Sequence, residues 1–448
     1  MPTSSRSIAF QILLRVERTD AYLNLALDAA FKATPGLTLS ERALITELAY
    51  GVMRHQGRLD ATIAAHATRP PGRLDPEIRV ALRLGAYQLF LMRTKPHAAV
   101  HETVELVKAL PRHRHAASFV NALLRAMTRK GALHEPDASL DLAERLAIEC
   151  SLPTWLVERW VARLGPDAAS ALCRAQNETP RIDIRVDPRR VSREAFLASL
   201  AQAGAKARPS RISPIGIELE TAGNVTALPG FFEGLFQVQD EAAQLVGLLP
   251  RVEKGMRILD ACAAPGAKTC HLAQRLGDLG RVHAIDLHAH KLRRLEDESR
   301  RLGLDHLIET LTADASAPLP FDDGAFDLVL ADLPCTGLGT LRRHPEIRYR
   351  RTSDDPARLA GLQRSIIRNL TRYLKPGGQL VYSVCSMEPE EGVAHLPFFE
   401  SLGLHPVAPD SADTIDWPLD EGGMAIATRP NQHGCDGFFG VRLMRRTS

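Results

Sequence analysis

Apolar residues in the first third of the chain recur at the three- and four-residue spacing of an amphipathic helix. Ile8, Ile12 and Val16 show this pattern, which returns in several later segments. Asp75 supplies a capping side chain and is followed by a first-turn proline, which marks one helix start. We therefore predict an all-α bundle over residues 1–140.

The next segment mixes two periodicities. A helical run at 151–164 precedes short strand-like runs at 181–186 and 215–220, which Pro and Gly turns separate. Residues 141–235 are interpreted as a small α+β connector.

From residue 236 onward, strand-like runs alternate with helical runs. RILD, VHAID, FDLVLAD and QLVYSVCS are each preceded or followed by an amphipathic segment. Such alternation predicts a doubly wound α/β domain over residues 236–448, with a mostly parallel sheet covered on both faces. Ligands bind outside the carboxyl ends of the strands in such sheets, so chemistry is expected there.

Composition adds limits to this picture. With 448 residues, 45% hydrophobic and 24% charged, the chain is a multidomain globular protein and not a disordered or coiled-coil one. It has no apolar leader and no uncharged run of 18 residues, so we expect a cytoplasmic protein without a membrane span. The seven scattered cysteines form no CxxC pair, which favours reduced thiols and no metal.

Small residues at 260–269, DACAAPGAKT, lie between a predicted strand and a predicted helix. They allow close approach of a ligand to free backbone N–H groups, although a tight strand-to-helix turn would also need them. Asp286 ends the next strand and suits ribose hydroxyls, and Asp314 follows as a contact for the base. Because the pyrophosphate motif GxGxxG is absent, S-adenosylmethionine (SAM) is favoured over NAD.

Two cysteines follow two strands that should be neighbours in the sheet. Cys335 lies in the run Asp332-Leu333-Pro334-Cys335, and Cys385 ends QLVYSVC. A lone buried Cys usually serves packing, but two beside a carboxylate indicate covalent chemistry. A thiolate that adds to carbon 6 of cytosine makes carbon 5 able to accept a methyl group, while Asp332 stabilises the charge at N3.

These motifs together resemble the RNA cytosine-C5 methyltransferases, most closely the bacterial 16S rRNA enzymes of the RsmB/Sun type. The resemblance rests on DACAAPGAKT, DLPCTGLGTLRRHPEIRY, VYSVCSMEPEEG and DGFFGVRLMRR. It extends to the N-terminal bundle, where SIAFQILLRV and LRLGAYQLFL are similar to a NusB-like RNA-binding domain. The resemblance implies a SAM-dependent methyltransferase with a Rossmann-like catalytic domain.

The resemblance also implies roles for individual residues. Cys385 is the nucleophile, Cys335 assists product release and Asp332 contacts N3. The substrate is 16S ribosomal RNA, at cytosine 967, and a monomer is expected. The implied SAM contacts are Cys262, Ala263, Ala264, Pro265, Gly266, Ala267, Lys268, Asp286, Asp314 and Asp332.

Spacing alone leaves the choice of nucleophile open, because a Pro-Cys pair serves that role in DNA cytosine methyltransferases and would point to Cys335. The chain also departs from the family pattern twice. Ala267 stands where a second loop glycine is usual, and is unstrained only if its φ is negative. Leu333 replaces a usual alanine and is expected to narrow the base pocket.

Positive charge is concentrated in two places, although the net charge is only +3. Residues 1–145 carry a net +6, and residues 342–372 carry nine Arg against three acidic residues. We predict phosphate contacts from the second stretch, with Tyr349 available to stack, while a solvated basic helix is the alternative. The predicted RNA-binding residues are Arg342, Arg343, Arg348, Arg350 and Arg351.

Two other functional hypotheses remain. A non-catalytic RNA-binding or antitermination factor would keep the fold without needing the two thiols, and a methyltransferase of the same chemistry could act on tRNA or 23S rRNA. Incubation with labelled SAM and 16S RNA, followed by measurement of methyl transfer, distinguishes these hypotheses from the first.

Overall fold

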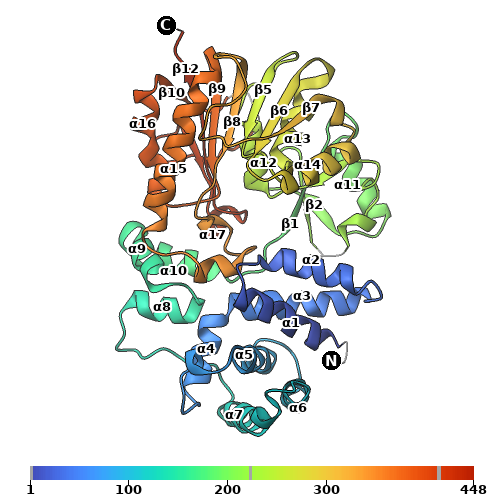
Figure 1. Ribbon diagram of the computed structural model, residues 1–448, viewed down its shortest axis with the longest axis vertical. Coiled ribbons are helices and arrows are strands. Elements are labelled where there is room, and N and C mark those ends of the chain that lie inside the picture. Colours follow the sequence, from blue (N-terminus) through green and yellow to red (C-terminus); the bar gives the residue numbers. More distant parts are fainter. Residues whose placement is uncertain (1–3, 221–223, 411–414, 448) are drawn as a thin grey trace. The chain divides into compact units, whose positions relative to one another are not determined.

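The computed structural model describes residues 4–220, 224–410 and 415–447. They form two compact units (Figure 1): one comprises residues 1–179 with 341–352, and the other 180–340 with 353–448. The predicted boundaries at 140 and 235 therefore do not coincide with the units. The helices between residues 140 and 179 and the short segment 341–352 pack in the N-terminal unit.

The first unit is all-α, as predicted for residues 1–140, and it also includes the helices up to residue 179. Thr38 and Glu41 form a capping box that starts one of its helices, and Ile12 and Val16 of the first helix are buried as the periodicity predicts. Its helices are α1 Ser5–Arg18, α2 Leu23–Ala33, α3 Leu39–Arg54, α4 Gln56–Ala64, α5 Pro76–Phe90, α6 Pro96–Lys108, α7 Ala117–Lys130, α8 Leu142–Cys150, α9 Thr154–Leu164 and α10 Pro166–Ala175.

The second unit begins with a four-stranded antiparallel sheet in the order β2-β3-β1-β4. Its strands are β1 Ile182–Val186, β2 Ala207–Pro209, β3 Gly216–Leu219 and β4 Phe236–Val238, and α11 Arg193–Gln202 packs against it. This is the small α+β connector that the sequence predicts.

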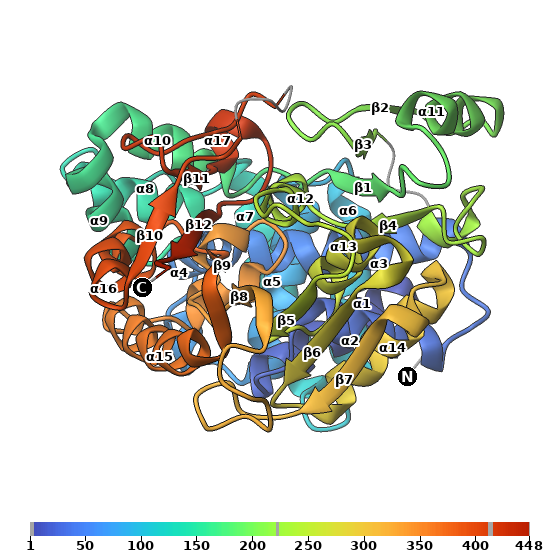
Figure 2. The ribbon, with the colours of Figure 1, turned by 90° about the horizontal axis from the view of Figure 1, so that it is seen from above.

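The larger sheet has the order β10-β12-β9-β8-β5-β6-β7, with β11 paired to β12. Figure 2 shows β9, β8, β5, β6 and β7 in a row. These five are parallel, whereas β12 is antiparallel to β9. The strands are β5 Arg257–Ala261, β6 Arg281–Asp286, β7 Ile308–Thr312, β8 Phe326–Asp332, β9 Leu374–Val384, β10 Leu404–Val407, β11 Ala425–Ala427 and β12 Phe439–Arg445.

Both faces of this sheet are buried, as in the predicted doubly wound domain. Adjacent residues of β5 serve opposite cores: Ile258 packs with the helices α12 to α14, and Leu259 packs with α15 and α16. The helices are α12 Glu241–Leu248, α13 Ala267–Leu276, α14 Ala289–Leu302, α15 Asp355–Leu370, α16 Leu396–Ser401 and α17 Pro430–His433.

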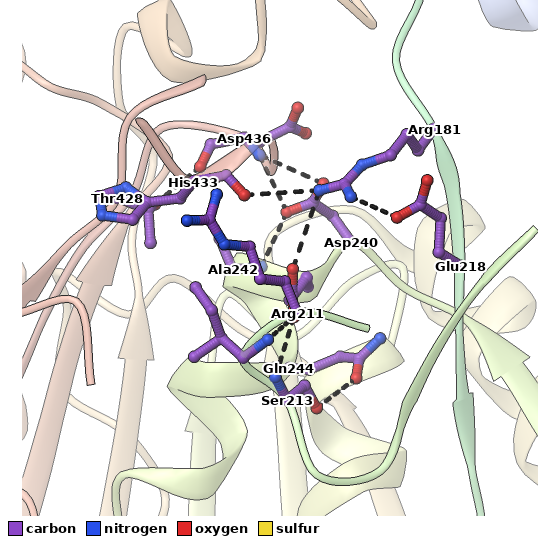
Figure 3. Close-up of polar contacts among 12 residues, drawn as sticks. Arg181, Arg211, Ser213, Glu218, Asp240, Ala242, Gln244, Thr428, His433 and Asp436 are labelled. Carbon is purple, nitrogen blue, oxygen red and sulfur yellow. Dashed lines mark hydrogen bonds and ion pairs between the residues drawn. The ribbon is translucent and has the colours of Figure 1, made fainter. Parts of the chain in front are cut away.

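A polar cluster ties the four-stranded sheet to the larger one within the second unit (Figure 3). Asp240 caps α12 by accepting from the Ala242 N–H at 2.9 Å, and it also accepts from the Asp436 N–H at 3.2 Å. Arg181, just before β1, donates to the His433 carbonyl at 3.5 Å. The segment that precedes β12 is therefore held against the start of α12.

Within the described residues, no helix is both long and apolar enough to cross a bilayer.

Candidate active site

Two thiols meet where β8 and β9 end. The strands pair in parallel with Asp332 opposite Ser383, so the loops that follow them leave the same edge of the sheet. The Sγ atoms of Cys335 and Cys385 lie 3.2 Å apart, and both side chains are partly exposed. The structure thus brings together the two cysteines that the sequence singles out.

The two sulfurs share one hydrogen bond, in which either thiol can be the donor. The hydrogen bond with Cys385, aided by burial, raises the pKa of the Cys335 thiol well above its ordinary value. Cys335 therefore stays protonated and can donate its S–H to the Cys385 sulfur. A thiolate is the nucleophilic form of cysteine, and a pair of thiols in contact can supply one.

Lys268 joins the cofactor loop to this pair. Its Nζ lies 2.6 Å from Asp332 Oδ2 and 5.0 Å from the centre of the Phe438 ring, and its charge interacts with Cys385. The Ser383 hydroxyl donates to the other oxygen, Asp332 Oδ1, at 2.6 Å. Asp332 is thus fixed from two sides, by Lys268 and by Ser383.

Ser383 and Phe438 were not among the predicted site residues. Ser383 could have been found from the pairing of β8 with β9. It lies opposite Asp332, and residues opposite each other in neighbouring parallel strands lie side by side. Phe438 lies just before β12 and belongs to no local motif that points to Lys268.

The loop from Cys262 to Gly266 leads from β5 into α13. Cys262 has a positive φ of 63°, the Ala264–Pro265 peptide is cis, and the Ala263 N–H donates to the Ile285 carbonyl at 2.9 Å. Gly266 has a φ of 105°, and a Cβ there would lie 2.5 Å from Leu295 Cγ. Only glycine fits this position, because both the backbone and the space exclude a side chain.

Both departures from the family pattern fit the fold. Ala267 is the first residue of α13, and the only positive-φ residues other than glycine in the described chain are Ser151 and Cys262, so alanine is unstrained. Leu333 is 4% exposed and packs in the core on the α15 face. Its side chain contributes to this core.

Carboxylates gather around the cofactor loop. Burial raises the pKa of Cys262 to about 12, with further contributions from Asp286, Asp260, Asp332 and Asp314. Asp260 is fully buried, and its Oδ1 has no hydrogen-bond partner in the described chain. SAM carries a sulfonium and an ammonium group, so this excess of negative charge fits such a cationic ligand.

Asp286 and Asp314 occupy the predicted positions after β6 and β7. Asp286 accepts from the His288 N–H at 2.9 Å, and Asp314 accepts from the Ser316 N–H at 2.8 Å. These local turns orient the two carboxylates at the same sheet edge as the loop. Their roles toward the ribose and the base of the cofactor stay a prediction.

The prediction that Arg348 contacts RNA phosphate is wrong. Its side chain is 1% exposed, and the guanidinium donates to the carbonyls of Arg54, Cys150 and Gln176 at 2.8, 3.1 and 2.5 Å. Asn177 Oδ1 accepts from it at 2.7 Å. Arg348 is a buried cation that satisfies backbone carbonyls within the helical unit.

Arg342 is also wrong as a phosphate contact, because it is 2% exposed in the same unit. Arg343, Arg350 and Arg351 are half-buried. Arg350 donates to the Asp20 carbonyl at 3.0 Å and stacks on Tyr22. Charge density along the sequence therefore overstates the number of arginines that RNA can reach.

Family models match three successive parts of the chain. The model for the 16S rRNA methyltransferase RsmB/F matches residues 247–444, and the NusB family model matches residues 3–129. The ferredoxin-like domain of RsmF/B-like methyltransferases matches residues 152–226, which include the four-stranded sheet up to β3.

Relatives match this chain over most of its length and of their own. The probable ribosomal RNA small subunit methyltransferase B of Bacillus subtilis is 35% identical over 98% of both chains. Ribosomal RNA small subunit methyltransferase B of Pseudomonas syringae pv. tomato is 39% identical over 91% of this chain and 90% of its own. The crystal structure of PH0851 has a TM-score of 0.83 at 25% identity and covers 99% of both chains.

Proposed function

Because the chain belongs to the RsmB/F family of SAM-dependent 16S rRNA methyltransferases, we propose that it methylates carbon 5 of a cytosine through a covalent adduct on Cys385. The observation that carries this proposal is the 3.2 Å contact between the Cys335 and Cys385 sulfurs beside Asp332. By resemblance to the RsmB/Sun group, the target is cytosine 967.

Cys385 begins the reaction by attacking carbon 6 of the base. The sulfur forms a bond to carbon 6, and the electron pair of the C5=C6 bond becomes available at carbon 5 for the methyl group that bound SAM supplies. Asp332, held by Lys268 and Ser383, contacts N3 and stabilises the charge that develops there.

Release of the product requires loss of the carbon-5 proton, after which the C5=C6 bond forms again and the S–C6 bond breaks. Cys335 lies next to the adduct sulfur and assists this step. Cys335 must first lose its own proton, and its thiolate then accepts the proton from carbon 5.

Substrate RNA is bound by phosphate contacts. Arg343, Arg350 and Arg351 contribute to them, as does the basic helical unit, and the target base is flipped into the site. The enzyme acts as a monomer.

The test is methyl transfer from labelled SAM to 16S rRNA, followed by bisulfite mapping of the modified position. A protected cytosine at position 967 is expected. Methylation of tRNA or 23S rRNA alone would replace the substrate, methylation at another atom would overturn the carbon-5 chemistry, and an RNA complex without methyl transfer would identify a non-catalytic binding factor.

A further inference from the structure

Glu391 bridges the loops that carry the two thiols. It lies in a short 3₁₀ turn, Pro389–Glu391, and is fully buried. Its Oε1 accepts from the Thr336 N–H at 2.8 Å, and its Oε2 accepts from the hydroxyls of Thr336 and Ser386 at 2.5 and 2.6 Å. Thr336 directly follows Cys335, and Ser386 directly follows Cys385.

Further hydrogen bonds connect Glu391 and the Cys335 loop to α15 and β9. Gln363 of α15 donates through Nε2 to the Pro334 carbonyl at 2.9 Å and to Glu391 Oε1 at 3.2 Å. The Tyr382 hydroxyl, on β9, donates to the backbone carbonyl of Glu391 at 2.6 Å. Both neighbours of Cys335 in the chain are therefore tied into the network of Glu391.

Stability alone does not explain a carboxylate at this position. Burial raises the pKa of Glu391, although its hydrogen bonds oppose the shift, and no Lys or Arg of the described chain forms a salt bridge with it. A buried carboxylate without a cation costs desolvation energy that an apolar side chain avoids. The four hydrogen bonds that the carboxylate accepts instead hold the surrounding loops in position.

We infer that Glu391 is a positioning residue that holds the Cys335 and Cys385 loops at the separation which two-thiol chemistry requires. The inference rests on the proposed function only in taking the thiols as the reacting groups. Glu391 itself contacts neither sulfur. Without the bridge, the two loops are joined by the bond from the Gly339 N–H to the Cys385 carbonyl at 3.0 Å, by the contact between the Thr336 and Ser386 hydroxyls at 3.2 Å and by the contact between the two thiols.

A trivalent phenylarsenical measures the thiol separation without RNA or SAM. Phenylarsine oxide condenses with two thiols, forms two As–S bonds and releases its oxygen as water, with no change in the oxidation state of arsenic or sulfur. Binding that disappears in both Cys335→Ser and Cys385→Ala reports this pair, and binding that survives in these variants is the background from the other cysteines.

We expect Glu391→Leu to weaken the pair-specific binding on the order of tenfold or more, because the second thiol no longer lies at a high effective concentration. Glu391→Gln keeps an acceptor for the Thr336 N–H and presents its NH₂ group to hydroxyls that can accept, so it should stay near the wild type. Glu400→Leu, which removes an exposed acid on α16, is the matched control and should have no effect.

Three controls show whether Glu391→Leu is still folded: alkylation of each thiol alone, SAM binding by calorimetry and thermal unfolding. All three should match the wild type if only the separation of the thiols has changed. If Glu391→Leu does not fold, Ser386→Ala removes one contact of the bridge and should weaken arsenical binding by a smaller factor. Wild-type binding in a folded Glu391→Leu, or in Ser386→Ala, overturns the inference. A wild-type enzyme that binds the arsenical but methylates no RNA refutes the proposed function and leaves the inference standing.

Discussion

The Lys268 ammonium lies 2.6 Å from Asp332 Oδ2, so one ion pair joins the cofactor loop to the loop that carries Cys335. Lys268→Met should lower the single-turnover methyl-transfer rate about 100-fold, because it removes the cation that orients Asp332. Quench-flow measurement at saturating SAM tests this. Lys375→Met, which breaks an ion pair with Asp327 in the same unit, is the control, and equal rates in both variants would contradict the role of Lys268.

Substitution of each thiol separates the nucleophile from the residue that assists release. Cys335→Ser should accumulate an RNA adduct that survives denaturing gel electrophoresis, because the S–C6 bond forms but breaks slowly. Cys385→Ala should form none, while both variants bind SAM. An adduct in Cys385→Ala but not in Cys335→Ser would reverse the assignment.

The cofactor loop predicts a contrast between two neighbouring residues. Gly266→Ala forces a Cβ to within 2.5 Å of Leu295 at a φ of 105°, and should lower the free energy of unfolding by about 1–3 kcal/mol and weaken SAM binding. Ala267→Gly, at the first position of α13, should cost at most about 1 kcal/mol. Urea unfolding and calorimetry measure both effects, and equal losses would show that the loop tolerates a side chain at 266.

Asp260 predicts a pH dependence of stability. Burial raises its pKa from 3.8 to about 7 despite the bond from Thr269. Between these values the folded chain keeps a proton that the unfolded chain has lost, so stability falls as pH rises from about 4 to 7, by up to about 1.4 kcal/mol per pH unit, and then levels off.

Asp260→Asn removes this proton and should flatten that part of the profile. Urea unfolding of both proteins in the absence of SAM, at several pH values, gives the difference. Parallel profiles would mean that Asp260 ionises in the folded protein as it does in the unfolded one.

Arg348 and Arg351 should behave in opposite ways. Arg348→Met leaves the carbonyls of Arg54, Cys150 and Gln176 without their donor and should cost about 3 kcal/mol of stability, with an unchanged salt slope of RNA binding. Arg351→Gln should reduce the salt slope of RNA binding by about 1. Filter binding over a range of salt concentrations measures the salt slope. A lower slope for Arg348→Met would show that Arg348 contacts RNA phosphate.

Strand alternation was sufficient to predict that Cys335 and Cys385 meet. Consecutive βα units place the carboxyl ends of parallel strands at one edge, and the residues that follow β8 and β9 cannot lie far apart. The prediction that helices cover both faces of the sheet is also confirmed, since Ile258 and Leu259 lie in opposite cores. These features depend on local periodicity, which a single sequence displays.

Arg348 and Glu391 could not be placed in this way, because their partners come from distant segments. The carbonyls that bind Arg348 belong to α3, α8 and the end of α10. The order of side chains in the sequence does not show which backbone carbonyls will accept hydrogen bonds. Glu391 reads as one acid in a short acidic run, and only the fold shows that both of its oxygens accept hydrogen bonds from the thiol loops.

The placement of residues 341–352 in the helical unit means that the backbone passes between the two units three times. No single cleavage can then release either unit intact. A fragment that ends at residue 179 lacks Arg348 and leaves its carbonyl acceptors unpaired. Split-protein experiments on this enzyme must therefore return the 341–352 peptide to the N-terminal fragment before either half can be assayed alone.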